Sequence, residues 1–102
     1  MFKKLEELVK TIRDRRDNPQ EKSYTNKLLN DKKLSLDKIK EEIQELVEAI
    51  EKDTNKIHEA ADVVYHLLVY LEANNVKIED VLNEIENRKK WLTMIIIFLL
   101  KF

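Results

Sequence analysis

The sequence predicts an all-α fold, and three features support this class. The chain has 102 residues, no glycine and a single proline, Pro19. Leu, Ile, Glu and Lys dominate it, and apolar residues recur every three or four positions. We therefore expect an antiparallel helical bundle without a sheet. A domain of this size buries about two thirds of the surface that its unfolded chain exposes, so we expect dimerisation to complete the bundle.

The first half of the chain predicts three helices. The first is expected over residues 2–16, with the run Asp17-Asn18-Pro19 ending it. A polar loop leads to a short helix over residues 23–30. Ser35 is a suitable N-cap for a longer helix that ends near Lys52.

The second half predicts two further helices. Thr54 is a suitable N-cap for a helix that runs to about Ala73, and a last amphipathic helix uses Ile78 and the apolar residues after it. Since the chain has no glycine, Asn is the next best residue for left-handed positions at helix ends. We expect such breaks at these positions: Asn18, Asn30, Asn74 and Asn75.

The apolar end of the chain, residues 89–102, is expected to lie outside the domain formed by residues 1–88. Residues 91–100 would be about 15 Å long as a helix, against a hydrocarbon core of about 30 Å, so the segment cannot span a bilayer alone. We expect it to pack against a partner or against the other helices. A membrane-surface contact or an aggregation-prone tail are the alternatives.

Charge and composition exclude several classes of protein. With 19 Lys plus Arg and 20 Asp plus Glu, the net charge of −1 supports neither a nucleic-acid binder nor a polyacidic tail. The absence of cysteine excludes disulfides and thiolate metal sites. The start of the sequence, MFKKLEELVK, lacks the apolar core of a secretory signal, and a cytoplasmic protein is therefore expected.

Two predicted helices carry carboxylates one turn apart. The first offers Glu41, Glu42 and Glu45, and the second offers Glu59 and Asp62. If the two helices pack antiparallel, these groups can point into one gap. Glu42 and Glu45 are expected at the rim or wet side of their own helix, where an ordinary solvated face is the simpler explanation.

The second helix favours a site. Glu59, Asp62 and His66 form one stripe on a helix that is otherwise apolar, and no Lys or Arg occurs between residues 57 and 76. An unpaired carboxylate in such surroundings costs several kcal/mol, and a hard cation such as Mg²⁺ relieves this cost. Glu-x-x-His, a ligand pair of di-iron bundles, is absent, which favours Mg²⁺ or Mn²⁺ over iron and oxygen ligands over zinc.

Histidine and tyrosine side chains leave several roles open. His66 either orients Asp62 or contacts substrate, or it is a buried imidazole satisfied by one hydrogen bond. His58 is expected to face solvent near the start of its helix. Tyr65 and Tyr70 are expected as core or interface aromatics with wet hydroxyls.

Four segments in order resemble a known family. They are SYTNKLL (23–29), KIKEEIQELVEA (38–49), EAADVVYHLLVYL (59–71) and IEDVLNEIENR (78–88). Together they resemble the phosphoribosyl-ATP pyrophosphohydrolases of histidine biosynthesis, which belong to the MazG-type all-α nucleotide pyrophosphohydrolases. The resemblance implies a homodimeric all-α enzyme. It implies Mg²⁺-dependent hydrolysis of phosphoribosyl-ATP to phosphoribosyl-AMP and pyrophosphate, and possible association with the phosphoribosyl-AMP cyclohydrolase.

The resemblance also implies roles for individual residues. Metal ligands would be Glu42, Glu45, Glu59 and Asp62, with Glu41 as a second metal contact or a base that orients water. Substrate contacts would come from Ser23, Tyr24, Thr25 and Lys27, and His66 is a further candidate. Arg13, Arg15 or Arg16 could help to neutralise the triphosphate, and a water held by the metal or by a carboxylate would be the nucleophile.

One departure and two rival functions accompany this interpretation. The family usually has glycine where this chain has Lys40, which suggests a straighter helix and a different charge near the metal. A rival enzyme would be a house-cleaning pyrophosphohydrolase of (deoxy)nucleoside triphosphates. From another class, the chain could be a non-catalytic helical interaction module whose acidic stripe pairs with a basic partner.

Overall fold

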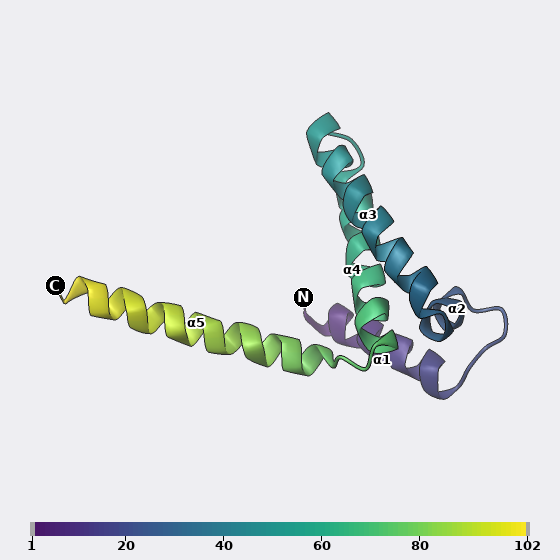
Figure 1. The fold of residues 1–102 in the computed structure, drawn as a ribbon, viewed down its shortest axis with the longest axis horizontal. Helices are drawn as coiled ribbons and strands as arrows, with labels where there is room; N and C mark the ends of the chain where they lie inside the picture. Colours follow the sequence, from purple (N-terminus) through teal and green to yellow (C-terminus); the bar gives the residue numbers. More distant parts are fainter. Residues whose placement is uncertain (1, 102) are drawn as a thin grey trace.

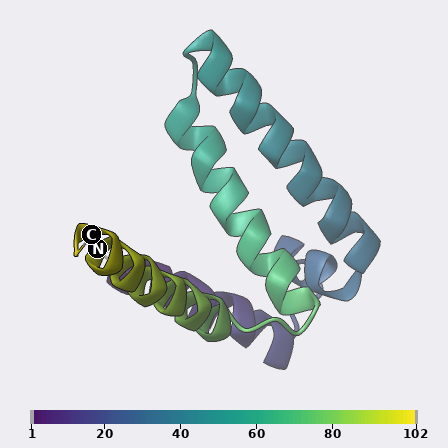
Figure 2. The same cartoon turned by 60° about the vertical axis from the view of Figure 1, so that its left-hand side comes forward.

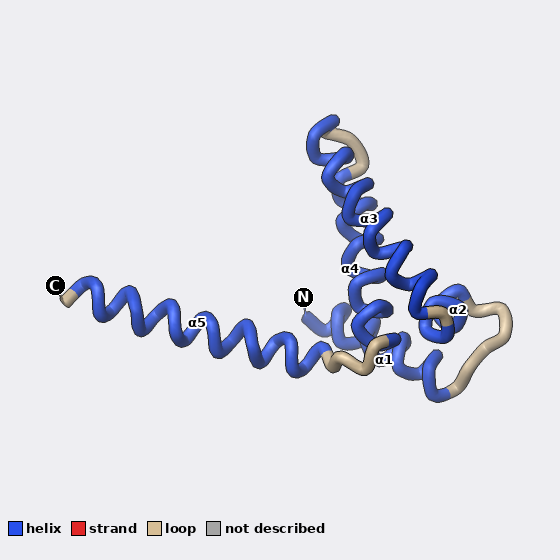
Figure 3. Tube along the Cα trace, in the orientation of Figure 1, coloured by secondary structure: helices blue, strands red, loops and turns tan. Residues whose placement is uncertain are grey.

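The computed structural model describes residues 2–101, and this part of the chain holds five helices and no strand. The helices are α1 (Phe2–Asp17), α2 (Tyr24–Asn30), α3 (Lys32–Lys52), α4 (Lys56–Ala73) and α5 (Ile78–Leu100). Figure 3 shows them joined by short loops. The predicted all-α class is confirmed.

An antiparallel hairpin of α3 and α4 forms the centre of the fold (Figures 1 and 2). The two helices are joined by residues 53–55, so the predicted antiparallel packing is confirmed. At the other end of the hairpin, α1 and α2 pack against α4. The core there consists of Ile12, Leu28, Leu68 and Val69, which are almost completely buried.

Helix ends agree with the predictions better than helix starts. The predicted starts at Ser35 and Thr54 are wrong. Helix α3 begins earlier, because the side chain of Asp31 accepts a hydrogen bond from the Leu34 amide at 3.0 Å and caps the helix. Ser35 is instead buried within the first turns of α3, with 1% of its surface exposed.

The backbone motif that ends α3 explains why Thr54 does not cap α4, and the same motif ends α4. The Thr54 amide donates to the Ala49 carbonyl, and the residue before it, Asp53, is left-handed with φ 54°. This Schellman motif closes α3 and uses Thr54 for that purpose, so Asn55 is the first flanking residue of α4. The same motif closes α4, where Asn75 has φ 59° and the Val76 amide donates to the Leu71 carbonyl.

Asn fills fewer left-handed positions than predicted. Asn75 was predicted and is confirmed, whereas Asn18, Asn30 and Asn74 have negative φ. Asn30 is the last residue of α2, as predicted, but it keeps a helical conformation and donates from its side chain to the Asn26 carbonyl. Left-handed residues within the described range include Asp53 and Asn55, both in the turn between α3 and α4.

Helix α5 extends away from the other four helices (Figures 1 and 2). It is continuous from Ile78 to Leu100, without a break at residue 88, and only its first part lies against α4. The apolar residues beyond Trp91 are mostly exposed, and none of α5 is fully buried. Within a single chain the tail therefore does not pack against the bundle, and that part of the prediction is wrong. Packing against a partner, a membrane-surface contact and an aggregation-prone tail stay predictions. Across the described residues, no helix is long and apolar enough to cross a membrane.

Candidate metal and phosphate site

The hairpin of α3 and α4 brings three predicted carboxylates together. Oxygen atoms of Glu42, Glu45 and Glu59 lie within 4.8 Å of one another. Glu42 and Glu45 are one turn apart on α3, and Glu59 faces them from the first turn of α4. A cavity of about 170 Å³ opens beside Glu45 and Glu59 at the closed end of the hairpin.

Glu42 is much more buried than predicted. Only 9% of its surface is exposed, although its position on α3 alone suggested the rim. The reason is that α4 covers this side of α3, which a single helix cannot reveal. Neither Glu42 Oε2 nor Glu59 Oε2 has a hydrogen-bond partner in the described residues.

This arrangement is electrostatically unfavourable without a cation. Burial raises the pKa of Glu42 above its ordinary value, and the charge of Glu45 raises it further. The pKa of Glu59 is raised by the same two causes in the same order. The three groups therefore compete for a proton or for a positive ion.

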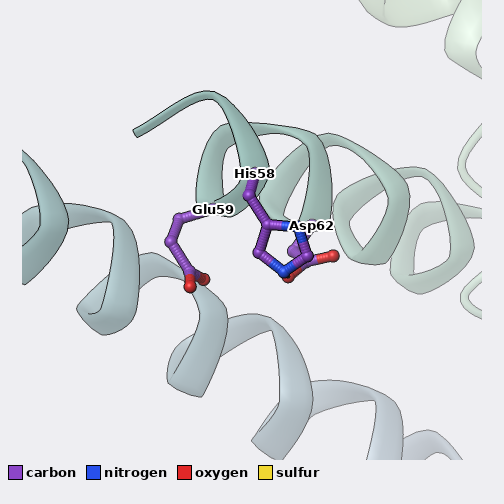
Figure 4. A group of neighbouring side chains, drawn as sticks. All are labelled: His58, Glu59 and Asp62. Carbon is purple, nitrogen blue, oxygen red and sulfur yellow. The ribbon is translucent and has the colours of Figure 1, made fainter. Parts of the chain in front are cut away.

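The fourth predicted ligand, Asp62, lies one turn further along α4. It forms a second group with His58 and Glu59, whose ligand atoms also lie within 4.8 Å of one another. Figure 4 shows Glu59 reaching toward the neighbouring helix, while His58 and Asp62 lie beside each other. Glu59 thus belongs to both groups. Asp62 is close to Glu59 and belongs only to the group with His58.

His66 connects the site to α2. Its Nδ1 lies 2.9 Å from the Asp62 carbonyl oxygen, which can only accept, so Nδ1 carries the proton. In the neutral ring Nε2 then accepts from the Tyr24 hydroxyl at 3.1 Å. His66 is therefore buried and doubly bonded, and it contacts the backbone of Asp62 rather than its carboxylate.

The SYT segment is held against α4 by these side chains. Ser23 caps α2 by accepting from the Asn26 amide, and the Thr25 hydroxyl bonds to the Tyr65 hydroxyl at 2.5 Å. Burial raises the pKa of Tyr24, which also senses the charges of Lys38 and Glu42. Tyr24, the first residue of α2, is thus the part of this segment that senses the acidic cluster.

A wide cavity of about 510 Å³ adjoins this segment. Its lining includes Ser23, Tyr24 and the exposed residue Lys27, whereas Thr25 points to Tyr65 instead. Tyr24 is common to the cavity and to the hydrogen bonds that lead to Asp62. Of the predicted substrate residues, Tyr24 is thus connected to a predicted metal ligand, and Lys27 is exposed at the cavity, where it can meet an anion.

One predicted residue, Glu41, has a different neighbour from the one expected. Glu41 is exposed, and its carboxylate accepts from Lys38 at 3.1 Å, so it lies outside both acidic groups. The sequence reasoning missed the pairing of Lys38 with Glu41. Their spacing of three residues on one helix was the signal for it.

The arginines of α1 are engaged at the far end of α4. Arg13 donates to both oxygens of Glu79, at 2.8 and 2.5 Å, and to Glu72 at 3.3 Å. Arg16 donates to Glu72 at 2.6 Å. Glu72 is 13 residues beyond Glu59, about 20 Å along the helix. Arg13 and Arg16 are therefore paired with glutamates at this end of α4 and do not contact the carboxylate cluster, and their role in neutralising the triphosphate stays a prediction.

The donor set fits a hard divalent cation. Oxygen ligands at about 2.1 Å from a common ion lie between about 3.0 and 4.2 Å apart, which is within the 4.8 Å span of the three glutamates. The two unpartnered buried oxygens of Glu42 and Glu59 are atoms that such an ion would satisfy. The site can therefore hold a hard divalent cation, and such an ion binds phosphate oxygens readily.

Comparison with known proteins identifies similar sequences. Residues 5–89 match the family model of phosphoribosyl-ATP pyrophosphohydrolase. The chain is 44% identical over 92 residues to a phosphoribosyl-ATP pyrophosphatase of Clostridium novyi, which covers 84% of this chain and 81% of that protein. It is 41% identical over 91 residues to a phosphoribosyl-ATP pyrophosphatase of Halobacterium salinarum. This alignment covers 83% of this chain and 96% of that protein.

A longer relative is also similar. The chain is 40% identical over 87 residues to the histidine biosynthesis bifunctional protein HisIE of Pyrococcus furiosus, which covers 84% of this chain and 41% of that protein. The match to the family model ends at residue 89, so the apolar end of α5 has no counterpart in it. No solved structure shows a significant match to the chain.

Proposed function

The chain belongs to the phosphoribosyl-ATP pyrophosphohydrolase family, and we propose from this that it is a Mg²⁺-dependent enzyme whose site is the acidic cluster of α3 and α4. As a member it is a hydrolase of histidine biosynthesis that releases pyrophosphate from phosphoribosyl-ATP. The observation that carries the assignment of the site is the convergence of Glu42, Glu45 and Glu59 within 4.8 Å.

Four carboxylates would hold the ion. Glu42, Glu45 and Glu59 form the centre of the ligand set, and Asp62 adjoins it through Glu59. When bound, Mg²⁺ supplies positive charge to the phosphate oxygens of the substrate and polarises the phosphoanhydride bond. Mn²⁺ has similar ligand preferences and is a suitable replacement.

The α2 segment would hold the rest of the substrate. Lys27 is exposed beside the 510 Å³ cavity and can neutralise a phosphate. The Tyr24 hydroxyl is oriented by His66, which is itself fixed by the Asp62 carbonyl. These two hydrogen bonds connect Tyr24, which lines the cavity, to the backbone of Asp62, a proposed metal ligand.

The reaction consumes one water molecule. The water oxygen forms a new bond to one phosphorus atom of the α–β phosphoanhydride while the bond from that phosphorus to the bridging oxygen breaks, which gives phosphoribosyl-AMP and pyrophosphate. The proton that the water loses passes to a carboxylate. Glu41, which is exposed and bonded to Lys38 one residue before Glu42, is a candidate for orienting the water and accepting this proton.

The test is a pyrophosphate-release assay with phosphoribosyl-ATP, with and without Mg²⁺. Glu59→Gln should reduce Mg²⁺-dependent turnover about 100-fold or more, because a lost metal ligand removes several kcal/mol of transition-state stabilisation. Glu51→Gln is the matched control, since Glu51 is an exposed glutamate of α3 that belongs to neither acidic group and does not line the cavity beside them. Full turnover by Glu59→Gln, or faster release from ordinary nucleoside triphosphates than from phosphoribosyl-ATP, would contradict the proposal.

We further propose that the enzyme works as a homodimer. Large apolar side chains are exposed on both helices of the hairpin: Ile43, Val47, Ile50, Ile57, Val64 and Leu67. Their spacing of three, four and seven residues is that of a helix face that packs against another helix. A second hairpin that covers this face would complete a four-helix bundle and bury it from water.

Two further expectations rest on the family. The longer relatives named bifunctional in histidine biosynthesis support association of this chain with the phosphoribosyl-AMP cyclohydrolase. The cytoplasm is the proposed compartment, because the substrate is a nucleotide of a biosynthetic pathway. Co-elution of this chain with the cyclohydrolase at micromolar concentration would support the first expectation, and separate elution would contradict it.

A further inference from the structure

His58 has a position that the family assignment does not use. It precedes Glu59 in the first turn of α4 and lies one turn before Asp62 (Figure 4). Its Nε2 is 3.4 Å from Asp62 Oδ2, and 73% of its side chain is exposed. The three ligand atoms of His58, Glu59 and Asp62 all lie within 4.8 Å of one another.

Glu59 belongs to this group and to the all-carboxylate group. One neighbouring set contains Glu42 and Glu45, which offer only oxygen, and the other contains His58, which offers nitrogen. Glu42 is nine-tenths buried, and its unpartnered Oε2 lies in the first set. This buried oxygen is an independent sign that a cation binds beside Glu59, since a carboxylate rarely stays buried without a partner.

We propose that His58 is an additional metal ligand, which together with Glu59 and Asp62 forms a mixed nitrogen–oxygen position beside the carboxylate cluster. This inference rests on the proposed function, because it assumes that the cluster binds a cation. The position would hold a transition ion such as Mn²⁺ or Zn²⁺ more tightly than Mg²⁺. The side chain thus sets metal preference and is not needed for Mg²⁺ binding itself.

The observed distance agrees with shared coordination. Two ligands at about 2.1 Å from one ion lie about 3.4 Å apart in tetrahedral geometry and about 3.0 Å apart when adjacent in octahedral geometry. The 3.4 Å between His58 Nε2 and Asp62 Oδ2 corresponds to the first value. Both atoms can therefore reach one ion with little movement of the helix.

Ligand chemistry explains the expected preference. Mg²⁺ prefers oxygen ligands and retains its waters, whereas imidazole suits Zn²⁺ and other transition ions, which bind nitrogen more strongly. His58 is exposed, so binding an ion removes little water from the protein. The simpler alternative is an ordinary imidazole–carboxylate pair at a spacing of four residues on one helix.

The experiment measures metal binding to the whole chain without substrate. Calorimetric titrations with Mg²⁺, Mn²⁺ and Zn²⁺ are compared for the wild type, His58→Gln and Glu59→Gln. We expect His58→Gln to weaken Mn²⁺ or Zn²⁺ binding about tenfold or more and to change Mg²⁺ binding by less than about twofold. Circular dichroism of His58→Gln should match the wild type, because the replaced side chain is exposed.

A spectroscopic readout identifies the nitrogen. Pulsed electron paramagnetic resonance of bound Mn²⁺ should show coupling to an imidazole nitrogen in the wild type and none in His58→Gln. Coupling that persists in His58→Gln would assign the nitrogen to the other histidine, His66, and would overturn the proposal.

The two proposals fail in different ways. If His58→Gln binds all three ions like the wild type while Glu59→Gln no longer binds Mg²⁺, His58 only pairs with Asp62 on the same helix. The inference is then overturned and the proposed function stands. If the wild type binds none of the three ions, both the inference and the proposed metal site are overturned.

Discussion

Glu42 is the residue at which sequence and structure differ most in the site. Its proposed role as a metal ligand is what the family resemblance implies, but its burial could not be predicted from the sequence. A helical wheel describes one helix in isolation and placed Glu42 at the rim. The surface that covers it belongs to α4, so its environment is a tertiary property.

Replacing Glu42 by Gln should stabilise the protein without metal and remove the effect of Mg²⁺. Burial and Glu45 raise the pKa of Glu42, so its stabilising contribution is present below about 4.5 and is lost as the pH rises through the folded pKa. At pH 7 the metal-free wild type therefore carries an unfavourable charge. Glu42→Gln should gain about 1 kcal/mol there, or roughly 4–8 °C in melting temperature.

Thermal melts with and without Mg²⁺ check this prediction. The wild type should melt higher with Mg²⁺, since a ligand of the native state raises its stability, whereas Glu42→Gln should respond little. Glu51→Gln serves as the exposed control and should behave like the wild type. A Glu42→Gln protein that Mg²⁺ stabilises as much as the wild type would mean that this carboxylate is not a ligand.

Glu79 should make the fold sensitive to acid. The hydrogen bonds from Arg13 lower the pKa of Glu79 from 4.5 to about 2. Its stabilising contribution is therefore present above about 4.5 and is lost as the pH falls toward about 2. Between pH 5 and pH 2, chemical unfolding should show a steeper loss of stability for the wild type than for Glu79→Gln. Parallel pH profiles would show that the Arg13–Glu79 pair is too well solvated to matter.

At the scale of single helices, the number and order of the helices were predicted well from the sequence. The residues at which α3 and α4 begin were predicted less well. Apolar spacing located the five helical segments, because their periodicity depends only on nearby residues. Start sites failed where several capping residues stand close together: Asp31 precedes Ser35, and Thr54 is followed by Asn55. The Schellman motif at the end of α3 decides the second case, and it requires a left-handed residue that no short pattern announces.

The cap of α3 can be tested by substitution. Asp31→Ala should cost about 1 kcal/mol of unfolding free energy, because it leaves the Leu34 amide without its side-chain partner. Thr54→Ala is the matched control, since Thr54 acts through its backbone amide, and it should cost less than about 0.5 kcal/mol. Urea unfolding followed by circular dichroism measures both. A larger loss for Thr54→Ala than for Asp31→Ala would restore the predicted cap.

At the scale of the whole molecule, the exposed apolar face of α3 and α4 should control assembly. Leu67→Glu places a charge in the proposed interface and should convert dimers to monomers at micromolar concentration. Leu82→Glu is the control, because Leu82 has similar exposure but lies on α5. Mass measurement by light scattering distinguishes the two states. Dimers that survive Leu67→Glu and dissociate with Leu82→Glu would move the interface to α5.

The projecting helix α5 also increases the hydrodynamic radius of the protein. The radius of gyration is 17.2 Å, whereas a compact chain of this length has about 13 Å. An elongated monomer diffuses slowly and elutes early from a gel-filtration column, at a volume expected of a heavier sphere. Elution volume alone would thus overstate its molecular weight, and shortening the chain after Arg88 should delay elution by more than the lost mass explains.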